Sequence, residues 1–268
     1  MKALGVAIGG LGAIGLELAK RLNAGIPGLY LVAVSARDHA AAEKRLKAAG
    51  IAAPVLGLAE LATRAEIVVE CLPAAQFRAI SEPAIEHGRI FVPLSAGALL
   101  ENFDLVERAK QTGARIIVPT GALLGLDAVR AASEGKIHSV TMVSRKPPQG
   151  LEGAPYLTEH KISLANLKAP LKVFDGSARE GSRGFPANVN VAAALSLAGI
   201  GPDPTRLEIW ADPGIDRNIH RIEVEADSAR FSMTIENVPS ENPKTGRITA
   251  LSVIACLKGL VAPLKIGS

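Results

Sequence analysis

Aromatic side chains and cysteines are both scarce in this chain of 268 residues. Phe, Trp and Tyr make up 3% of it, so the hydrophobic share of 48% comes mainly from aliphatic side chains. Such side chains suit closely packed layers of helix on sheet better than an aromatic-rich binding surface. Cys71 and Cys256 lie far apart in apolar segments, with no CxxC or Cys/His spacing. We therefore expect buried, reduced thiols, with neither a disulfide framework nor a metal site.

Charge of one sign is not concentrated anywhere along the chain. The 30 basic and 26 acidic side chains give a net charge of +4 without a long run of either sign. A nucleic-acid surface needs Lys and Arg clustered on one face, so we expect no nucleic-acid partner. The mild positive balance favours anionic small molecules through electrostatic steering.

A long hydrophobic segment is missing too. The most apolar late stretch, residues 248–264, is shorter than a bilayer requires and contains Lys258 and Pro263. The opening MKALGVAIGGLGAIG starts like a signal peptide, but it has no Ala-x-Ala cleavage pattern and runs into Glu17 and Lys20 on a helical face. We expect no signal peptide, no membrane segment and a cytoplasmic location.

The first half of the chain alternates short apolar runs with helical patterns. Ile14, Leu18 and Leu22 recur every four residues and so share one helical face. Near-continuous apolar strands between helices are typical of a parallel sheet covered on both sides, which predicts an α/β, Rossmann-type doubly wound domain. The expected strands are residues 3–9, 29–35, 67–72, 90–94 and 116–119, and the expected helices are residues 14–23, 39–49, 74–86 and 100–111.

The pattern changes after Gly121. Charged and apolar residues alternate in the later strands, as in antiparallel strands of a sheet with one wet face, so a smaller α+β domain for substrate binding and oligomerisation is predicted. Its expected strands are residues 137–144, 207–211, 219–226 and 229–237, and its expected helices are 124–133 and 187–198. An apolar helix over 245–260 is expected to return to the first domain. The predicted domains are residues 1–121 completed by 245–268, and residues 122–244.

Gly10, Gly12 and Gly15 form a GxGxxG pattern with Ala13 and Ile14 between them. The pattern alone is weak in a chain this rich in glycine and alanine, but it lies between an apolar strand and an amphipathic helix, as a dinucleotide site requires. We expect Gly10 to allow a tight turn, Gly12 to admit a pyrophosphate to the backbone, and Gly15 to permit close packing of helix on strand. The helix N-terminus would supply N–H groups to the phosphates.

The end of the second strand bears on the choice of coenzyme. An NAD-selective site usually has an acidic residue there for the ribose hydroxyls, whereas this strand ends with Ser35 followed by Arg37. Ser35 and Arg37 could bind a 2′-phosphate, so NADP is expected to be accepted alongside NAD and is a candidate for the preferred coenzyme. Alternatively, Asp38 caps the next helix and Arg37 extends into solvent.

Three further loops should reach the carboxyl edge of the sheet, where open α/β sheets bind ligands. Small residues in them would let a flat nicotinamide ring approach the backbone, although ordinary turn chemistry explains each loop equally well. The expected coenzyme contacts in these loops are Cys71, Leu72, Ser95, Ala96, Gly97 and Ala122.

Several segments of the second half resemble the L-aspartate dehydrogenase family. They are DGSAREGSRGFPANVNVAAALSLAGIG (residues 175–201), ADPGIDRNIH (211–220), ENPKTG (241–246), PTGALLGLDAV (119–129) and SRKPP (144–148). The resemblance implies oxidative deamination of L-aspartate with NAD or NADP, or the reverse amination of oxaloacetate with ammonia. It also implies release of iminoaspartate for nicotinamide cofactor biosynthesis and a homo-oligomer, dimer or larger. His220 matches the family's catalytic histidine, and Ala122 and Asn190 match positions that contact the dinucleotide.

The chemistry of the reaction agrees with a histidine at this place. Hydride transfer from Cα needs a neutral amine, and hydrolysis of the imine needs an attacking water, so a group that titrates near neutrality without a large shift suits both proton movements. We predict that His220 handles these protons at the nicotinamide. The two substrate carboxylates call for cationic or hydroxyl donors or amides. The candidates are Arg145, Lys146, Lys244, Thr245 and Asn188, each of which could instead be solvated or cap a helix.

Two other functions stay open at this point. One is a reductase of the same two-domain layout acting on a dihydrodipicolinate- or homoserine-type substrate. The other is a nicotinamide-nucleotide sensor without turnover, for which His220 would be dispensable. Fold alone does not separate these possibilities, because function depends on the site.

Overall fold

The computed structural model describes residues 3–186, 189–239 and 246–267. The chain forms two compact units, and each is described by itself. Unit 1 consists of Met1–Pro119 with Ala250–Ile266, and unit 2 consists of Thr120–Thr249 with Gly267–Ser268. None of the helices in the described ranges combines the length and the apolar character that a bilayer crossing demands.

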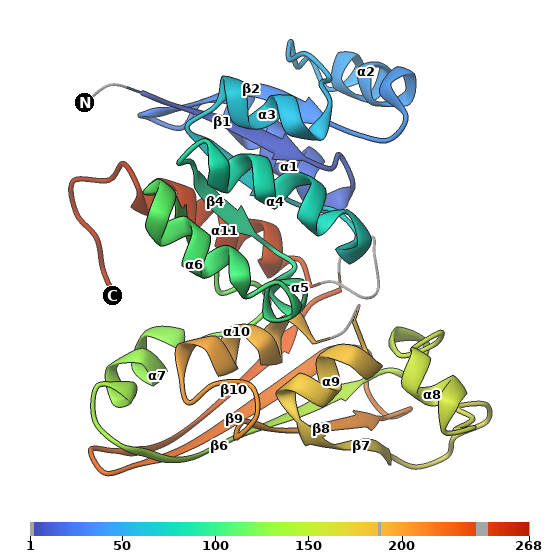
Figure 1. Ribbon diagram of the computed structural model, residues 1–268. Helices are drawn as coiled ribbons and strands as arrows, with labels where there is room; N and C mark the ends of the chain where they lie inside the picture. Colours follow the sequence, from blue (N-terminus) through green and yellow to red (C-terminus); the bar gives the residue numbers. More distant parts are fainter. Residues whose placement is uncertain (1–2, 187–188, 240–245, 268) are drawn as a thin grey trace. The chain divides into compact units, whose positions relative to one another are not determined.

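Unit 1 is built on a parallel five-stranded sheet in the order β2-β1-β3-β4-β5 (Figure 1). All four residues of β3 are buried, which explains why Ile67, Val68 and Val69 form a continuous apolar run rather than an alternation; Glu70 ends the strand. The predicted Rossmann-type arrangement is thereby confirmed. The strands are β1 (Leu4–Gly9), β2 (Leu29–Ser35), β3 (Ile67–Glu70), β4 (Ile90–Pro93) and β5 (Arg115–Ile116).

Helices cover both faces of this sheet. One group contains α3, α4 and α6, and the other contains α1, α2 and α11, whose apolar side chains join β1 and β2 in one buried cluster. Val253, Ile254 and Leu257 of α11 belong to that cluster, so the C-terminal helix completes the core of unit 1 as predicted. The helices are α1 (Ala13–Asn23), α2 (His39–Ala48), α3 (Leu58–Arg64), α4 (Phe77–Glu86), α5 (Ala96–Glu101), α6 (Asp104–Thr112) and α11 (Ile248–Gly259), with a 3-10 turn η1 (Ala74–Gln76).

The single helix predicted over residues 100–111 is wrong, because the structure has two helices there. Asn102 ends α5, and its amide nitrogen donates to the carbonyl oxygen of Ala98 at 2.8 Å. Asp104 then starts α6, where an acidic residue is favoured by the helix dipole. Helix α3 was not predicted, because its seven residues are too few to show a clear periodicity.

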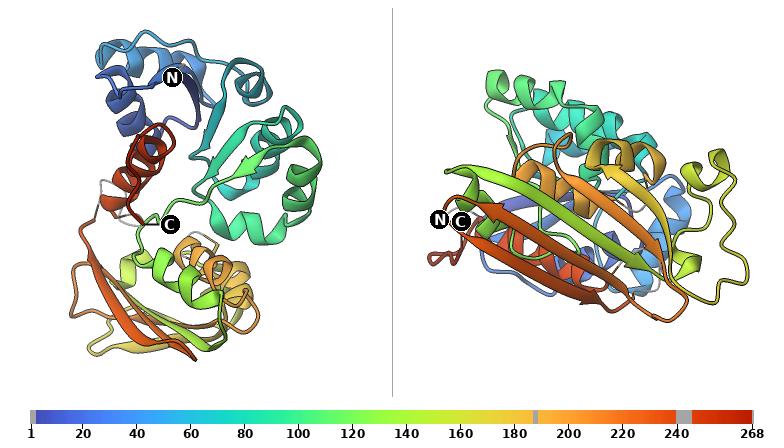
Figure 2. Two further views of the ribbon diagram at one scale, coloured as in Figure 1. Left: turned by 90° about the vertical axis from the view of Figure 1, so that its left-hand side faces the viewer. Right: turned by 90° about the horizontal axis from the view of Figure 1, so that it is seen from below.

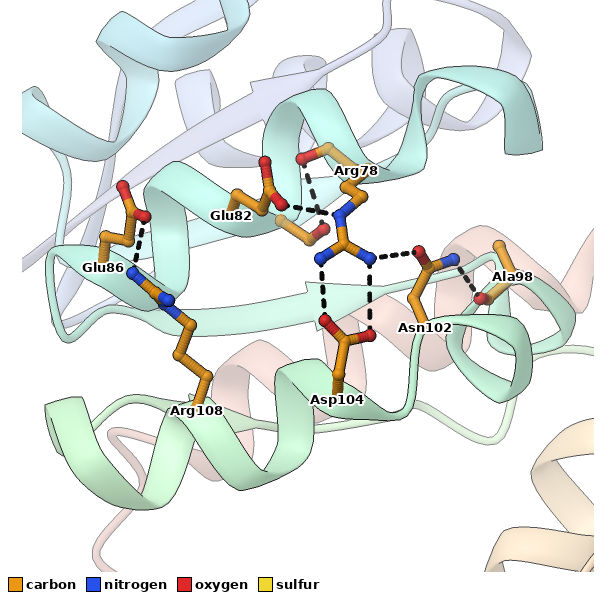
Figure 3. Close-up of polar contacts among 8 residues, drawn as sticks. Arg78, Glu82, Glu86, Ala98, Asn102, Asp104 and Arg108 are labelled. Atoms are coloured by element: carbon orange, nitrogen blue, oxygen red, sulfur yellow. Dashed lines mark hydrogen bonds and ion pairs between the residues drawn. The ribbon is translucent and has the colours of Figure 1, made fainter.

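Arg78 connects α4 to the α5–α6 junction at the surface of unit 1 (Figure 3). Its guanidinium donates to Glu82 on the same helix, to Asp104 and to Asn102. The pKa of the Asp104 carboxyl is lowered because it accepts these hydrogen bonds from Arg78. A second pair, Arg108 with Glu86, joins the same two helices at 2.9 Å.

Unit 2 contains a mixed five-stranded sheet in the order β10-β9-β6-β8-β7. Strands β9 and β10 are antiparallel, as predicted, but β8 runs parallel to β6, which corrects the expectation that all these strands are antiparallel. A strand parallel to β6 requires a crossover, and the long chain between them supplies it. The strands are β6 (Ile137–Lys146), β7 (Leu171–Ser177), β8 (Arg206–Ala211), β9 (Asn218–Ala226) and β10 (Arg230–Asn237).

In the part of unit 2 that the structure describes, helices cover one face of this sheet and leave the other face uncovered. In the right-hand view of Figure 2 the uncovered face is turned toward the viewer, and β6, in green, runs between β9 and β8. Val140 and Met142 of β6 alternate with less buried residues, so the inner face is the apolar one. The helices of unit 2 are α7 (Leu126–Ser133), α8 (Pro155–Glu159), α9 (Ala178–Gly184) and α10 (Asn190–Ala198), with a 3-10 turn η2 (Pro148–Gly150).

Strand β7 and helices α8 and α9 were not predicted from the sequence. Helix α9 contains two glycines in seven residues, which is unfavourable for a helix. It is held by a capping box, in which the Ser177 hydroxyl accepts from the Glu180 N–H and the Glu180 carboxylate accepts from the Ser177 N–H at 2.8 Å. Strand β7 has a register shift between Lys172 and Phe174, which breaks its alternation.

Candidate active site

The glycine-rich loop joins β1 to α1 in unit 1. Gly10 has φ +98°, and its N–H donates to the carbonyl oxygen of Ser35 at 2.8 Å, so the turn is tied to the end of β2. A Cβ at Gly10 would meet the carbonyl oxygen of Cys71 at 2.5 Å. A Cβ at Gly15 would overlap the carbonyl oxygen of Gly10. Both positions therefore require glycine, for the turn and for close helix–strand packing.

The same loop leaves room for a phosphate at Gly12. Apart from Gly12 and its two neighbours in the chain, no described residue places an atom within 4 Å of where a Gly12 Cβ would stand. Gly12 is also the N-cap of α1 and carries no side chain to occupy the first N–H groups of the helix, at Ala13 and Ile14. An open, positively polarised cradle of this kind fits the pyrophosphate of a dinucleotide.

The end of β2 lies beside this loop and is followed by no acidic side chain before Asp38. Ser35 is buried, and Arg37 is exposed. Asp38 caps α2 by accepting from the Ala41 N–H at 2.9 Å, as the alternative interpretation of this strand end proposed. Arg45, which the sequence reasoning did not single out, donates from its guanidinium to the carbonyl oxygen of Leu11 at 3.3 Å.

The loops after β3 and β4 are brought together by one buried carboxylate. Glu70 ends β3 with 0% exposure, and it accepts hydrogen bonds from the backbone of Leu72, Leu94 and Ser95 and from the Ser95 hydroxyl. Burial raises the pKa of Glu70 despite these four donors. Of the predicted contacts, Cys71, Leu72 and Ser95 lie in these two loops, and Ala96 and Gly97 are the first residues of α5. Glu70 was missed, although an acidic residue closing an apolar run was a visible signal.

In unit 2 the inner face of the sheet changes from apolar to polar at one end. Along β6, Val140 and Met142 are followed by Ser144 and Lys146, which are each 3% exposed. Along the antiparallel neighbour β9, the residues at the same end are the buried His220 and Asn218. Burying polar groups is costly unless they are paired, so this concentration indicates a functional site rather than ordinary core.

His220 is the centre of this polar end. It lies opposite Ser144 in the β6–β9 ladder, and the Ser144 Oγ and His220 Nδ1 atoms are 3.0 Å apart. Burial, together with the charge of Lys146, lowers the pKa of His220 to about 3. The expectation that His220 titrates near neutrality without a large shift is therefore wrong for the ligand-free chain, because the sequence did not reveal its burial beside a cation.

The other predicted substrate residues separate into two groups. Lys146 lies on the His220 face, whereas the neighbouring Arg145 lies on the opposite face, 5.4 Å from the Trp210 ring centroid. Arg145 pairs there with the buried carboxylate of Asp212 at 3.2 Å. The structure therefore does not bring Arg145 together with His220. Lys244, Thr245 and Asn188 lie outside the described residues.

Two further predicted positions lie elsewhere in unit 2. The carbonyl oxygen of Ala122 accepts a hydrogen bond from the side-chain amide of Asn237 at 3.0 Å, which fixes the start of the unit against β10. Asn190 is the first residue of α10, and Val189 is its N-cap, so Asn190 does not cap this helix. Within the described ranges, no three His, Cys, Asp or Glu side chains gather as a metal-ligand set.

Comparisons with known proteins agree with this arrangement. Residues 10–119 match the family model of the homoserine dehydrogenase NAD-binding domain, and residues 127–260 match that of the aspartate dehydrogenase C-terminal domain. L-aspartate dehydrogenase of Bradyrhizobium diazoefficiens is 58% identical, covering 99% of this chain and 94% of that protein. L-aspartate dehydrogenase 3 of Bordetella bronchiseptica is 55% identical, covering 99% and 98%.

A solved structure supports the same fold at lower identity. The crystal structure of aspartate dehydrogenase from Thermotoga maritima is 22% identical and superimposes with a TM-score of 0.73, covering 98% of this chain and 99% of that one. The glycine-rich loop is common to many dehydrogenases, whereas the second unit and the full-length relatives point to one family. This chain belongs to the L-aspartate dehydrogenase family.

Proposed function

We propose that this protein catalyses the NAD(P)-dependent oxidative deamination of L-aspartate to oxaloacetate and ammonia through iminoaspartate, and the reverse reductive amination. The observation that carries the proposal is the buried group of Ser144, Lys146 and His220, at the polar end of a sheet in the unit that matches the aspartate dehydrogenase family. A homoserine-type reductase is supported only by the match of the first unit, which concerns coenzyme binding.

Unit 1 would hold the coenzyme. The backbone at Gly12 and the N-terminus of α1 suit the pyrophosphate, and the loops joined by Glu70 suit the nicotinamide half. When bound, the nicotinamide supplies the hydride acceptor or donor for the substrate Cα. The protein's own residues then have to bind the carboxylates, exclude water and move protons.

Lys146 is the residue best placed to bind a substrate carboxylate beside His220. Its ammonium group is buried, and its charge already acts on the imidazole. A carboxylate next to an ammonium group forms a strong, charge-assisted hydrogen bond. We therefore assign Lys146 the role of orienting the dicarboxylate.

His220 would handle the protons of the amine and of the attacking water. For this role its Nδ1–H donates to the Ser144 hydroxyl, which leaves Nε2 as the acceptor. A ligand-free pKa of about 3 makes the imidazole a weak base. A bound dicarboxylate brings two negative charges toward Lys146 and His220, so it raises the pKa of His220 and makes proton uptake easier.

We also propose that NADP is used alongside NAD. No acidic side chain stands at the end of β2 where ribose hydroxyls would be bound, since Ser35, Ala36 and Arg37 follow one another there. Arg37 is exposed, and Arg45 holds its guanidinium at Leu11 in the phosphate loop. The Arg45 guanidinium at this loop, and Arg37 two residues after the end of β2, favour a 2′-phosphate.

The wider setting follows from the proposed reaction. Release of iminoaspartate before its hydrolysis would supply nicotinamide cofactor biosynthesis, and we propose that the protein works in the cytoplasm as a homo-oligomer. The support for this part is the family membership.

A direct assay tests the proposal. Oxaloacetate, ammonia and either NADH or NADPH are mixed with the protein, and the absorbance of the reduced nicotinamide is followed. We expect the reduced coenzyme to be oxidised when oxaloacetate and ammonia are present. In His220→Ala, kcat should fall about 10²- to 10⁴-fold while the affinity for the coenzyme stays unchanged. If both reduced coenzymes stay intact with oxaloacetate while another keto acid reacts, the aspartate assignment is wrong. Full activity of His220→Ala would remove His220 from the mechanism.

A further inference from the structure

The two loops at the carboxyl edge of β3 and β4 share a single internal anchor. The Glu70 carboxylate accepts from the Leu72 N–H at 2.7 Å, in the loop that leads to α4. It accepts from the Leu94 N–H at 3.2 Å and from the Ser95 N–H at 2.9 Å, in the loop that leads to α5, and from the Ser95 hydroxyl at 3.0 Å. One side chain thus fixes two segments more than twenty residues apart.

This set of donors demands a carboxylate. An ionised carboxylate has about four lone-pair sites, so it can satisfy all four donors, whereas a carboxamide offers one oxygen and turns an NH₂ group toward N–H donors. Glu70 has 0% exposure, so water would not replace a lost partner. A buried charge is expensive even when it is hydrogen-bonded, and a purely structural link between loops could be made by neutral groups.

The order of the strands shows which part of a dinucleotide these loops would meet. The phosphate loop follows β1, and the end of β2, on one side of β1, is where a ribose phosphate would be bound. Strands β3 and β4 lie on the other side of β1. A dinucleotide that crosses the carboxyl edge with its pyrophosphate at the β1 loop therefore extends its nicotinamide half toward the loops of β3 and β4.

We propose that Glu70 is a positioning residue, which sets the two loops in the arrangement that receives the nicotinamide half of the coenzyme. The proposal rests on the proposed function for the identity of the ligand. Glu70 acts through Leu72, Leu94 and Ser95 rather than by touching the coenzyme. Its effect should therefore appear in the binding of the nicotinamide half and in hydride transfer, and it should be absent from the binding of the adenosine half.

The test compares two ligands on two variants. Dissociation constants are measured for NADH and for ADP-ribose, which lacks the nicotinamide ring, by fluorescence or calorimetry. In Glu70→Gln we expect NADH to bind about tenfold more weakly, with ADP-ribose unchanged. The matched control is Glu66→Gln, because Glu66 precedes the same strand and accepts a single N–H, that of Gly5, at 2.7 Å. This control should bind both ligands like the unaltered protein.

A kinetic readout checks the same point during turnover. With NADH deuterated at C4, the isotope effect on kcat should increase in Glu70→Gln, because misplacement of the nicotinamide slows the hydride step relative to the others. An equal loss of affinity for NADH and ADP-ribose would overturn the proposal, since it would mean that Glu70 supports the fold in general. Unchanged affinity for both ligands would overturn it as well.

A second variant keeps the test decisive if Glu70→Gln does not fold. Glu70→Asp keeps the carboxylate but is one methylene shorter, so it loses part of the hydrogen bonding. Its affinity for NADH should also fall selectively, by a smaller factor than in Glu70→Gln. A selective loss of NADH affinity in a protein that does not turn over oxaloacetate would support the positioning role of Glu70 and contradict the proposed reaction. Turnover of oxaloacetate with no selective loss in either variant would keep the reaction and remove the role of Glu70.

Discussion

At the scale of single residues, the buried pair of His220 and Ser144 concentrates the chemistry of unit 2. The imidazole is held by a hydroxyl 3.0 Å away and is kept neutral by burial and by Lys146. The combination favours one ring orientation and leaves one nitrogen available. In the mechanism that we propose, a negative ligand that enters beside Lys146 changes the balance of charge at the ring.

Removal of the hydroxyl should separate orientation from chemistry. In Ser144→Ala we expect kcat for oxaloacetate reduction to fall about tenfold, because the buried Nδ1 loses its partner and the ring loses its preferred tautomer. KM for the coenzyme should stay the same, since Ser144 is in unit 2 and the phosphate loop is in unit 1. Steady-state kinetics measure both constants. Ser144→Thr keeps the hydroxyl and should retain most of the activity; equal losses in both variants would contradict this role.

The lowered pKa of His220 also predicts how stability depends on pH. The unfolded chain binds a proton at this histidine below its ordinary pKa of 6.5, whereas the folded chain does so only below about 3. Stability from this group is therefore complete above pH 6.5 and is lost as pH falls toward 3, by about 1.4 kcal/mol per pH unit. Denaturant unfolding between pH 4 and 7 should show a shallower pH dependence in His220→Asn. An identical slope in both proteins would show that the folded state protonates this ring.

At the scale of secondary-structure elements, local signals decided what could be predicted. Strand β3 and helix α1 were recognisable because a buried parallel strand is uniformly apolar and an amphipathic helix repeats every four residues. Helix α9 was not recognisable, because its stability comes from the Ser177–Glu180 capping box rather than from its composition. Its neighbour β7 depends on pairing with β8, which is distant in sequence.

The same distinction holds for the candidate site. The glycine-rich loop was predictable because its glycines are adjacent in sequence and their neighbours show its context. Ser144 was missed because its partner His220 lies 76 residues away, and Glu70 was missed because Ser95 lies 25 residues away. Arg145 was grouped with Lys146 by proximity in sequence, although adjacent residues of a strand point to opposite faces.

The capping box of α9 leads to a stability prediction at this scale. Ser177→Ala removes the hydroxyl that accepts from the Glu180 N–H, so it should lower the free energy of unfolding by about 1 kcal/mol. Ser177→Asp keeps a capping oxygen and should restore most of the loss. Denaturant titration monitored by circular dichroism measures the change. A neutral Ser177→Ala would mean that α9 is held by its packing alone.

The start of α1 gives a second prediction about an element. Gly15→Ala places a Cβ on the carbonyl oxygen of Gly10, so α1 must move away from the phosphate loop. We expect loss of NADH and ADP-ribose binding together, unlike the selective loss expected for Glu70→Gln. Gly259→Ala serves as a comparison, because Gly259 lies outside this loop at the end of α11 and has room for a Cβ. Normal ADP-ribose binding by Gly15→Ala would contradict the packing argument.

At the scale of the whole molecule, the core of unit 1 is built from both ends of the sequence. Leu257 of α11 is fully buried in the cluster that contains Leu18 and Val6. Leu257→Ala should destabilise unit 1 by about 2–5 kcal/mol, because it removes buried methyl groups and leaves a cavity. Loss of coenzyme binding along a denaturant titration should shift to lower denaturant and so report the unfolding of unit 1. The fluorescence of the single Trp210, which belongs to unit 2, should show an unchanged transition. Equal shifts by both probes would show that the two units unfold together.

This interrupted arrangement has a consequence during synthesis on the ribosome. Residues 1–119 emerge first, yet Val253, Ile254 and Leu257, which fill their core, are translated only after all of unit 2. At the usual rate of about 5–20 residues per second, the early segment waits roughly 7 to 27 seconds with apolar surface uncovered. Unit 2, whose strands and helices are contiguous in the chain, is complete sooner. His220 is therefore translated, together with the strands around it, before the core of unit 1 can be completed.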